Sequence, residues 1–244
     1  MSLLYQRSLS WGLDKCACIR FSRSYSVLVD HYIGGILIPN KVDFRDLGNL
    51  VDSSLKFHLH IREVFSKVSG VANNILKSTV CRTPEFMVQV FTSHIRPIID
   101  FCSVLWNTGY VGDIQLLESV QRRWTKNIDG LSHLSYAERL ATVNLFSIKG
   151  RLFRADLIMV WKILNGHCPS LAHLFTRADN DRTRGHSKKL FKPRHATDVR
   201  ARSFSIRVVG PWNSLPEEVV SASSLPSFKR RLCEYLGDSL FEFS

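Results

Sequence analysis

The chain has 244 residues, 45% of them hydrophobic, and a formal net charge of +12 at pH 7. This length and apolar content exclude a disordered tail and allow one or two domains with a buried core. The charge is uneven, because residues 176–210 hold 10 Lys and Arg against 3 Asp and Glu. Such a stretch favours anionic partners, nucleic acids above all, although a solvated basic loop has the same composition.

The sequence argues against export and against a membrane span. The first fifteen residues contain no apolar run of the length of a secretory signal. The most apolar window, residues 86–106, includes Arg96 and Asp100, so we expect no contact with a membrane. We therefore expect an intracellular protein, in the nucleus or the cytoplasm.

The six cysteines follow neither a disulfide framework nor a metal-site spacing. Without an export signal they are expected to stay reduced. Cys16 and Cys18 are closer together than in the usual zinc arm, and no His or Cys cluster stands near them. We expect no bound metal and no cofactor. We also expect no hydrolase site around His167 and Cys168, because no recognisable nucleophile, base and orienting acid occur together there.

Three regions differ in texture, and the first, residues 1–55, is predicted to form short β-strands. The strands are expected at residues 18–21 and 26–29 and in a hairpin over 32–38 that turns at Gly34 and Gly35. A second turn is predicted at 46–48, where Gly48 is free to adopt a positive φ.

The second region, residues 56–175, is predicted to be helical. Thr83 is placed to cap a helix that starts at Pro84, and Ser135 with Glu138 fits a capping box. Pro97 lies inside a helical pattern and is expected to kink or break the helix near Ile95.

Apolar stripes in this region indicate which helix faces are buried. The stripes comprise Leu117, Val120, Trp124 and Ile128 in one helix, and Phe153, Leu157, Val160, Trp161 and Leu164 in another that ends at Asn165 and Gly166. We interpret both as core. Glu118 is predicted to lie on the opposite, solvated face and to pair with Arg122 four residues later.

The third region, residues 176–244, contains the basic stretch, an aromatic turn at 210–216 and a terminal helix capped by Ser224. Trp212 is expected to anchor the turn in the core, because tryptophan is highly buried on average. The predicted fold class is therefore mainly α with a small N-terminal β portion (α+β), in which a helical bundle is followed by a basic region and a terminal helix.

Seven short strings follow one another along the chain, at residues 46–57, 94–97, 117–126, 130–140, 154–163, 183–186 and 212–216. In this order they resemble the C-terminal part of reverse transcriptases encoded by non-LTR retrotransposons, the jockey-like and related LINE elements. The resemblance covers about residues 11–236. It implies the end of a polymerase palm in 1–55, a helical thumb in 56–175 and a basic region behind it, with contacts to a template–primer duplex.

The residues also depart from that family. Its catalytic centre needs adjacent aspartates, because carboxylates must hold two metal ions for phosphoryl transfer. No Asp-Asp pair occurs in these 244 residues, and the nearest candidates, Asp179 and Asp181, lie in the basic region. We therefore expect no enzymatic activity from the chain on its own. The fingers and most of the palm are also expected to be missing, which makes a palm segment a further candidate partner.

The resemblance makes the basic region the main candidate for contacts with the backbone of an RNA–DNA hybrid or duplex. The candidate residues are Arg182, Arg184, Lys188, Lys189, Lys192, Arg194, Arg200 and Arg202, with Phe191 and His195 as stacking partners for unpaired bases. Secondary candidates on the thumb-like helices are Arg122, Arg123, Lys126, Arg151 and Arg154, each equally consistent with a solvated helix face. Lys15 resembles a remnant near the nucleotide site, with an ordinary surface lysine as the alternative.

Two functions follow as hypotheses. The first is a reverse-transcriptase-like chain that lacks the catalytic aspartates and retains sequence-independent nucleic-acid binding. The second is a structural or protein-interaction remnant of the same element, whose exposed apolar surface marks the contact with the absent palm.

Overall fold

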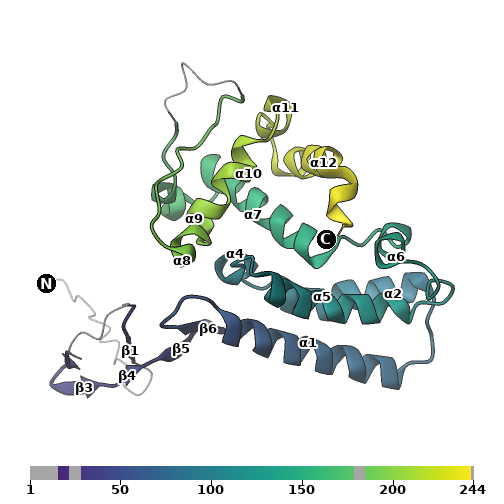
Figure 1. Ribbon diagram of the computed structural model, residues 1–244, viewed down its shortest axis with the longest axis horizontal. Coiled ribbons are helices and arrows are strands. Elements are labelled where there is room, and N and C mark those ends of the chain that lie inside the picture. Colours follow the sequence, from purple (N-terminus) through teal and green to yellow (C-terminus); the bar gives the residue numbers. More distant parts are fainter. Residues whose placement is uncertain (1–15, 22–28, 179–184, 243–244) are drawn as a thin grey trace, which may run out of the picture. The chain divides into compact units, whose positions relative to one another are not determined.

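A computed structural model describes residues 16–21, 29–178 and 185–242 and divides the chain into two compact units, Met1–Phe57 and His58–Ser244 (Figure 1). Helices take up 57% of the chain and strands 9%, which confirms the predicted fold class. Lys15, Arg182, Arg184 and most of the strand expected at 26–29 fall outside the described residues, as do Asp179 and Asp181.

The described part of the first unit is built from three small two-stranded sheets. They are the parallel pair β1 (Cys18–Ile19) and β4 (Asn40–Lys41), and the antiparallel pairs β2 (His31–Ile33) with β3 (Ile36–Ile38) and β5 (Asp43–Asp46) with β6 (Asn49–Asp52). Both predicted turns are confirmed. Gly34 and Gly35 join β2 to β3 at φ of 59° and 81°, and Gly48 joins β5 to β6 at φ of 88°, values that cost glycine little.

The second unit begins with helices that pack against one another. They are α1 (His58–Ser78), α2 (Pro84–Val90), the π-helical turn η2 (Phe91–Ile95), α3 (Arg96–Asp100), α4 (Ser103–Trp106) and α5 (Val111–Lys126). The disturbance expected near Ile95 takes the form of η2, in which the amide of Arg96 donates to the carbonyl of Phe91. Because Pro97 offers no amide hydrogen, a wider turn lets the chain continue as a helix instead of breaking.

The remaining elements are α6 (Tyr136–Thr142), α7 (Ile148–Leu164), η3 (Pro169–Leu174), α8 (Asp198–Ala201), α9 (Phe204–Arg207), α10 (Val209–Asn213), α11 (Glu217–Val220), α12 (Leu225–Leu236) and η4 (Gly237–Leu240). α7 is central, with α10 and α12 packed against it (Figure 1). Trp161, Trp212 and Phe228 meet in this core, each at most 2% exposed. The buried position expected for Trp212 is confirmed. Phe153 departs from its predicted stripe and is 37% exposed.

Two of the three predicted N-terminal caps form their expected bonds, and the third does not. Ser135 forms the complete capping box with Glu138, and the side chain of Ser224 accepts from the amide of Ser227. Thr83 does occupy the N-cap position before Pro84, but its side chain makes no capping bond. Its hydroxyl instead lies 3.6 Å from the Cys81 thiol.

The C-terminal turn η4 closes onto the first turn of α7. The Leu240 carbonyl accepts from the amide of Ser147 at 2.8 Å and from its hydroxyl at 3.1 Å. Gly150 makes this approach feasible, since a Cβ placed there would lie 2.6 Å from the Leu240 oxygen. The glycine is therefore required for close contact between two backbones.

The solvated position predicted for Glu118 is wrong, although the charge of Arg122 does act on its carboxylate. This residue is 1% exposed, and its carboxylate accepts from the hydroxyl of Tyr136 and from the amides of Ile148 and Lys149. Those two amides open α7, where the helix leaves them without an internal partner and where its dipole favours negative charge. Burial raises the pKa of Glu118, and the hydrogen bonds and the charge of Arg122 oppose that rise. Glu118, predicted to lie on a solvated helix face, thus caps the N-terminus of α7 from within the core.

Candidate nucleic-acid interface

The basic segment, residues 185–202, contains six Lys and Arg and a single acid, Asp198. It leads from an isolated β-bridge between Arg177 and Leu190 to the short helix α8. Between these points the chain has no regular secondary structure over 191–195. In Figure 1 it runs along one side of the helical unit as far as α8.

The start of the basic segment is fixed to the aromatic turn at 210–216. His186 is buried and shares a hydrogen bond of 2.9 Å with the Trp212 carbonyl, while the indole of Trp212 donates to the Lys188 carbonyl at 2.8 Å. The side-chain amide of Asn213 pairs with both backbone groups of Leu190. Two of the seven strings, 183–186 and 212–216, are therefore in contact. Their described residues hold the start of the basic segment against the aromatic turn.

Glu217, at the start of α11, also holds the beginning of the basic segment in place. Its carboxylate accepts from the amide and the hydroxyl of Ser187, and these bonds lower the pKa of Glu217. The positive charges that follow are thus held on an anchored backbone.

The end of the basic segment is fixed by Arg202, which makes internal contacts in addition to the nucleic-acid contact predicted for it. Its guanidinium bonds to Asp198 at 2.9 Å, donates to the Thr108 carbonyl at 3.2 Å and lies 4.0 Å from the ring centre of Tyr110. Tyr110 in turn donates to Asp198 at 2.8 Å. Partial burial, followed by the Asp198 bond, raises the pKa of Tyr110. These contacts hold α8 against the Thr108–Tyr110 segment, while the Arg202 side chain stays 33% exposed.

Between the contacts at the start of the basic segment and those of Arg202 at its end, several side chains are exposed to solvent. Lys192, Arg194, His195 and Arg200 are exposed, and Phe191 is 57% exposed. Lys188 and Lys189 are half-buried at the start, with the Lys188 ammonium 3.4 Å from the Asn165 side chain. The segment thus presents cations and one aromatic ring on a backbone held at both ends.

The secondary candidates separate into two groups. Arg122, Arg123 and Lys126 are exposed on the last two turns of α5. The Arg122 guanidinium lies over the Tyr136 ring, 4.9 Å from its centre. This cluster supplies positive charge to solvent at the end of α5, and the helix dipole favours cations there.

Arg151 and Arg154 do not lie on a solvated face. Arg151 has a 9% exposed side chain that forms an ion pair with Asp100, and burial lowers its pKa. The Nε of Arg154 lies 3.0 Å from the Cys233 sulfur. Both side chains line a groove along α7.

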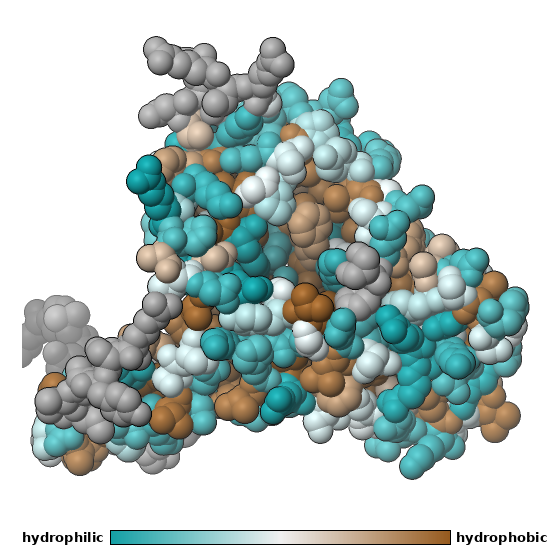
Figure 2. All heavy atoms as spheres, in the orientation of Figure 1, coloured by the Kyte–Doolittle hydropathy of each residue, from teal (hydrophilic) through white to brown (hydrophobic). Residues whose placement is uncertain are grey.

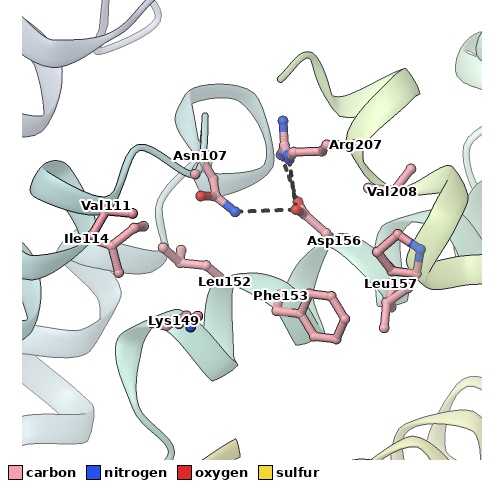
Figure 3. Close-up of a pocket in the computed structure, with 12 residues that line it drawn as sticks. Asn107, Val111, Ile114, Lys149, Leu152, Phe153, Asp156, Leu157, Arg207 and Val208 are labelled. Atoms are coloured by element: carbon pink, nitrogen blue, oxygen red, sulfur yellow. Dashed lines mark hydrogen bonds and ion pairs between the residues drawn. The ribbon is translucent and has the colours of Figure 1, made fainter. Parts of the chain in front are cut away.

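A second cavity, of about 240 Å³, lies on another side of α7 and contains an acidic residue that the sequence did not single out (Figure 3). Asp156 is 5% exposed and forms a two-pronged ion pair with Arg207 at 2.8 and 2.9 Å. Asn107 donates to the same carboxylate at 3.3 Å. Burial raises the pKa of Asp156, and the bonds from Arg207 and Asn107 oppose that rise.

This arrangement is that of a structural joint. Arg207 also donates to the carbonyls of Val104 and Arg202, so that one guanidinium connects α7, α9 and α4. The rest of the lining is largely apolar, with Leu152, Phe153 and Val208 around the pair. Nothing in it couples a nucleophile to a base, which is the requirement for covalent catalysis.

Within residues 16–21, 29–178 and 185–242, no group of three His, Cys, Asp or Glu side chains is arranged to hold a metal ion. None of the helices in these ranges has the length and apolar character needed to cross a bilayer. No family model, curated protein or solved structure matches the chain.

Proposed function

We propose that this chain is a reverse-transcriptase-like protein of a non-LTR retrotransposon that binds nucleic acid through phosphate contacts, without reading sequence and without catalysing polymerisation. The family assignment is supported by the order of the seven strings. The lack of catalysis is supported by the absence of any Asp-Asp pair in these 244 residues. The expected ligand is an RNA–DNA hybrid or a duplex.

One observation carries the binding proposal, namely the imbalance of charge in the basic segment. The segment has six Lys and Arg against a single acid, Asp198, which is bound by Arg202. Lys192, Arg194 and Arg200 are exposed to solvent. Lysine and arginine presented in this way replace counterions condensed on a phosphate backbone. The basic segment is also held in place at both ends. A binding surface gains affinity when its backbone is ordered before the ligand arrives, because less conformational entropy is lost on binding.

The test is the salt dependence of binding. The purified chain is titrated into a fluorescein-labelled RNA–DNA hybrid, and anisotropy is measured at salt concentrations from about 50 to about 200 mM. We expect log K to fall linearly with log salt, with a slope of several units. A flat titration, or extension of the hybrid's primer by the pure protein, overturns the proposal.

A charge-reversal variant places the contact on the basic segment. We expect Lys188→Glu, Lys189→Glu and Lys192→Glu together to reduce the slope by about 2 to 3 and to weaken binding by at least about tenfold. The matched control reverses three exposed cations of α1, Arg62, Lys67 and Lys77, and so changes the net charge equally. Equal losses in both variants mean that only overall charge matters, and that result contradicts a local contact.

A second candidate function, a protein-interaction or structural remnant, is favoured by the first unit. Tyr32, Ile33, Ile36 and Leu37 of its hairpin are each 41% exposed or more. Hydrophobic residues of this unit are visible at the surface in Figure 2. Apolar side chains grouped in this way favour association with another protein, and the resemblance supplies a palm segment as the partner.

Tyr32 and Leu37 face each other across this hairpin, which makes them a suitable pair to change. If the second function holds, light scattering shows concentration-dependent association of the natural chain, and Tyr32→Asp with Leu37→Asp reduces it. Binding to the hybrid is then absent in both. If the natural chain is instead monomeric and binds the hybrid, the first function is supported and the second is contradicted.

A further inference from the structure

A groove of about 620 Å³ runs along one face of α7, away from the basic segment's exposed residues. Its floor consists of Arg151, Arg154, Ala155, Ile158, Met159 and Lys162. These positions follow the i, i+3, i+4, i+7 pattern of a helix and so share one face. At 1.5 Å per residue the floor is about 16 Å long, and the volume lies in the range of ligand sites in proteins.

The walls of the groove add more positive charge. Arg96 comes from α3 and Lys229 from α12, so that five cations line it, against one acid, Asp100. Asp100 is already engaged by Arg96 and Arg151. The remaining cations, Arg154, Lys162 and Lys229, form no ion pair that the structure records within the described residues. The groove therefore has an excess of positive charge that a ligand can neutralise.

The same groove is mostly apolar between its charges. Phe146 and Phe204 line it together with Ile158, Met159 and Leu105. Each ring is supported edge-on by a second one, Phe146 by Phe241 at 5.4 Å and Phe204 by Phe175 at 5.7 Å between centres. A guanidinium also lies over each ring, Arg154 at 6.0 Å from the centre of Phe146 and Arg207 at 5.5 Å from the centre of Phe204. Aromatic rings and arginine planes are both suited to contact with a flat base.

We propose that this groove binds a short stretch of unpaired nucleotides, with phosphates at Arg154, Lys162 and Lys229 and bases against the apolar floor and the two phenylalanine rings. Along this face of α7 the apolar side chains of Ala155, Ile158 and Met159 lie between Arg154 and Lys162, and an unpaired strand likewise has an apolar base between charged phosphates. A length of about 16 Å accommodates a few nucleotides. The inference rests on the proposed function and adds a site for single strands to it.

The test uses two cysteines of the natural chain. Cys102 lines the groove, whereas Cys81 lies outside it, and both are exposed. The alkylation rate of each thiol by iodoacetamide is followed by peptide mass spectrometry, with and without a deoxythymidine oligonucleotide. We expect the oligonucleotide to slow alkylation of Cys102 by at least about fivefold and to leave Cys81 unchanged. Equal rates at Cys102 with saturating oligonucleotide overturn the proposal.

Variants locate the contact without disturbing the buried pairs. Lys162→Glu with Lys229→Glu is expected to weaken oligonucleotide binding by at least about tenfold and to abolish protection of Cys102. The matched control is Arg230→Glu with Lys67→Glu, which alters neighbouring and distant exposed cations outside the groove. If circular dichroism shows that the first variant is unfolded, the milder Lys162→Gln with Lys229→Gln replaces it. Undiminished binding by the folded variant contradicts the proposal.

Two further outcomes separate this inference from the proposed function. In the first outcome, a blunt hybrid binds in a salt-dependent way that requires Lys188, Lys189 and Lys192, but Cys102 is not protected. This result refutes nucleotide binding in the groove and leaves the proposed function standing. In the second outcome, the oligonucleotide protects Cys102 but the hybrid does not bind. This result supports nucleotide binding in the groove and refutes binding of the hybrid by the basic segment. If an acidic peptide protects Cys102 and the oligonucleotide does not, the groove belongs to a protein partner and the proposal fails.

Discussion

The buried charges around α7 and the exposed charges of the basic segment use the same residue types for opposite purposes. Asp156 and Arg207 satisfy each other inside the fold, and Glu118 caps α7 from α5. In the basic segment, by contrast, Arg194 and Lys192 lie exposed on a backbone fastened elsewhere. The number of charged residues in a chain therefore says little about binding until each has been assigned to an internal partner or to solvent.

This contrast also bears on the strings that resemble the retrotransposon family. Glu118 lies in string 117–126 and Tyr136 in 130–140, and the two side chains bond to each other. Asp156 lies in 154–163 and is buried as well. These members of the strings hold the fold together. The binding proposal instead depends on residues 188–200, which lie between two strings.

The largest expected effect comes from breaking the buried pair. Arg207→Ala is expected to lower the free energy of unfolding by about 3 to 5 kcal/mol, because it leaves the Asp156 carboxylate buried without its main partner. Urea denaturation followed by circular dichroism measures the change. The double variant Asp156→Ala with Arg207→Ala serves as control, since the two effects are expected not to add. Additive losses, or a loss near zero for the single variant, contradict the structural joint.

An intermediate effect is expected at Glu118. Burial raises its pKa in the folded protein above the ordinary 4.5, so the folded state binds the proton more tightly than the unfolded state. Its contribution to stability is then fully present below the ordinary pKa and is lost as the pH rises through the folded pKa. Glu118→Gln removes this titration, so the stability of the natural chain minus that of the variant is expected to fall as the pH rises.

Glu138 provides the matched control for Glu118, because the bonds to Ser135 lower its pKa. Its contribution is present above the ordinary pKa and is lost as the pH falls, so Glu138→Gln is expected to give a difference that grows with pH. Thermal melts of the three proteins at a series of pH values measure both differences. Parallel curves for the two variants contradict the assignment of one carboxylate to the core and the other to the surface.

The smallest effect on stability is expected in the basic segment. Arg194→Ala is expected to leave the melting midpoint unchanged, since the side chain is exposed and makes no recorded bond to a described residue. The same variant is expected to reduce the salt slope of hybrid binding by about 1. A clear drop in the melting midpoint moves Arg194 to the group of internal contacts and removes it from the interface.

Features decided by neighbouring residues could be predicted from the sequence. The Ser135 capping box, the turn at Gly34 and Gly35 and the disturbance before Pro97 depend on a few adjacent positions. Trp212 was also placed correctly, because a large apolar ring has few alternatives to burial.

Features decided by distant residues could not be predicted in this way. Glu118 meets an amide 30 positions later, Arg202 a carbonyl 94 positions earlier and Arg151 a carboxylate 51 positions earlier. Each of these side chains suits a solvated face equally well when only its helix is considered. The groove could not be predicted for the same reason, since its walls come from five separate elements, α3, α4, η3, α9 and α12.

The contact between Leu240 and Ser147 has a practical consequence for anyone preparing shorter versions of the protein. A cut made before position 240 removes the acceptor of two hydrogen bonds from the root of the central helix. Gly150 would then border an open slot in which water replaces a carbonyl. Shortened versions of the protein are therefore expected to keep this contact only if they extend past residue 240.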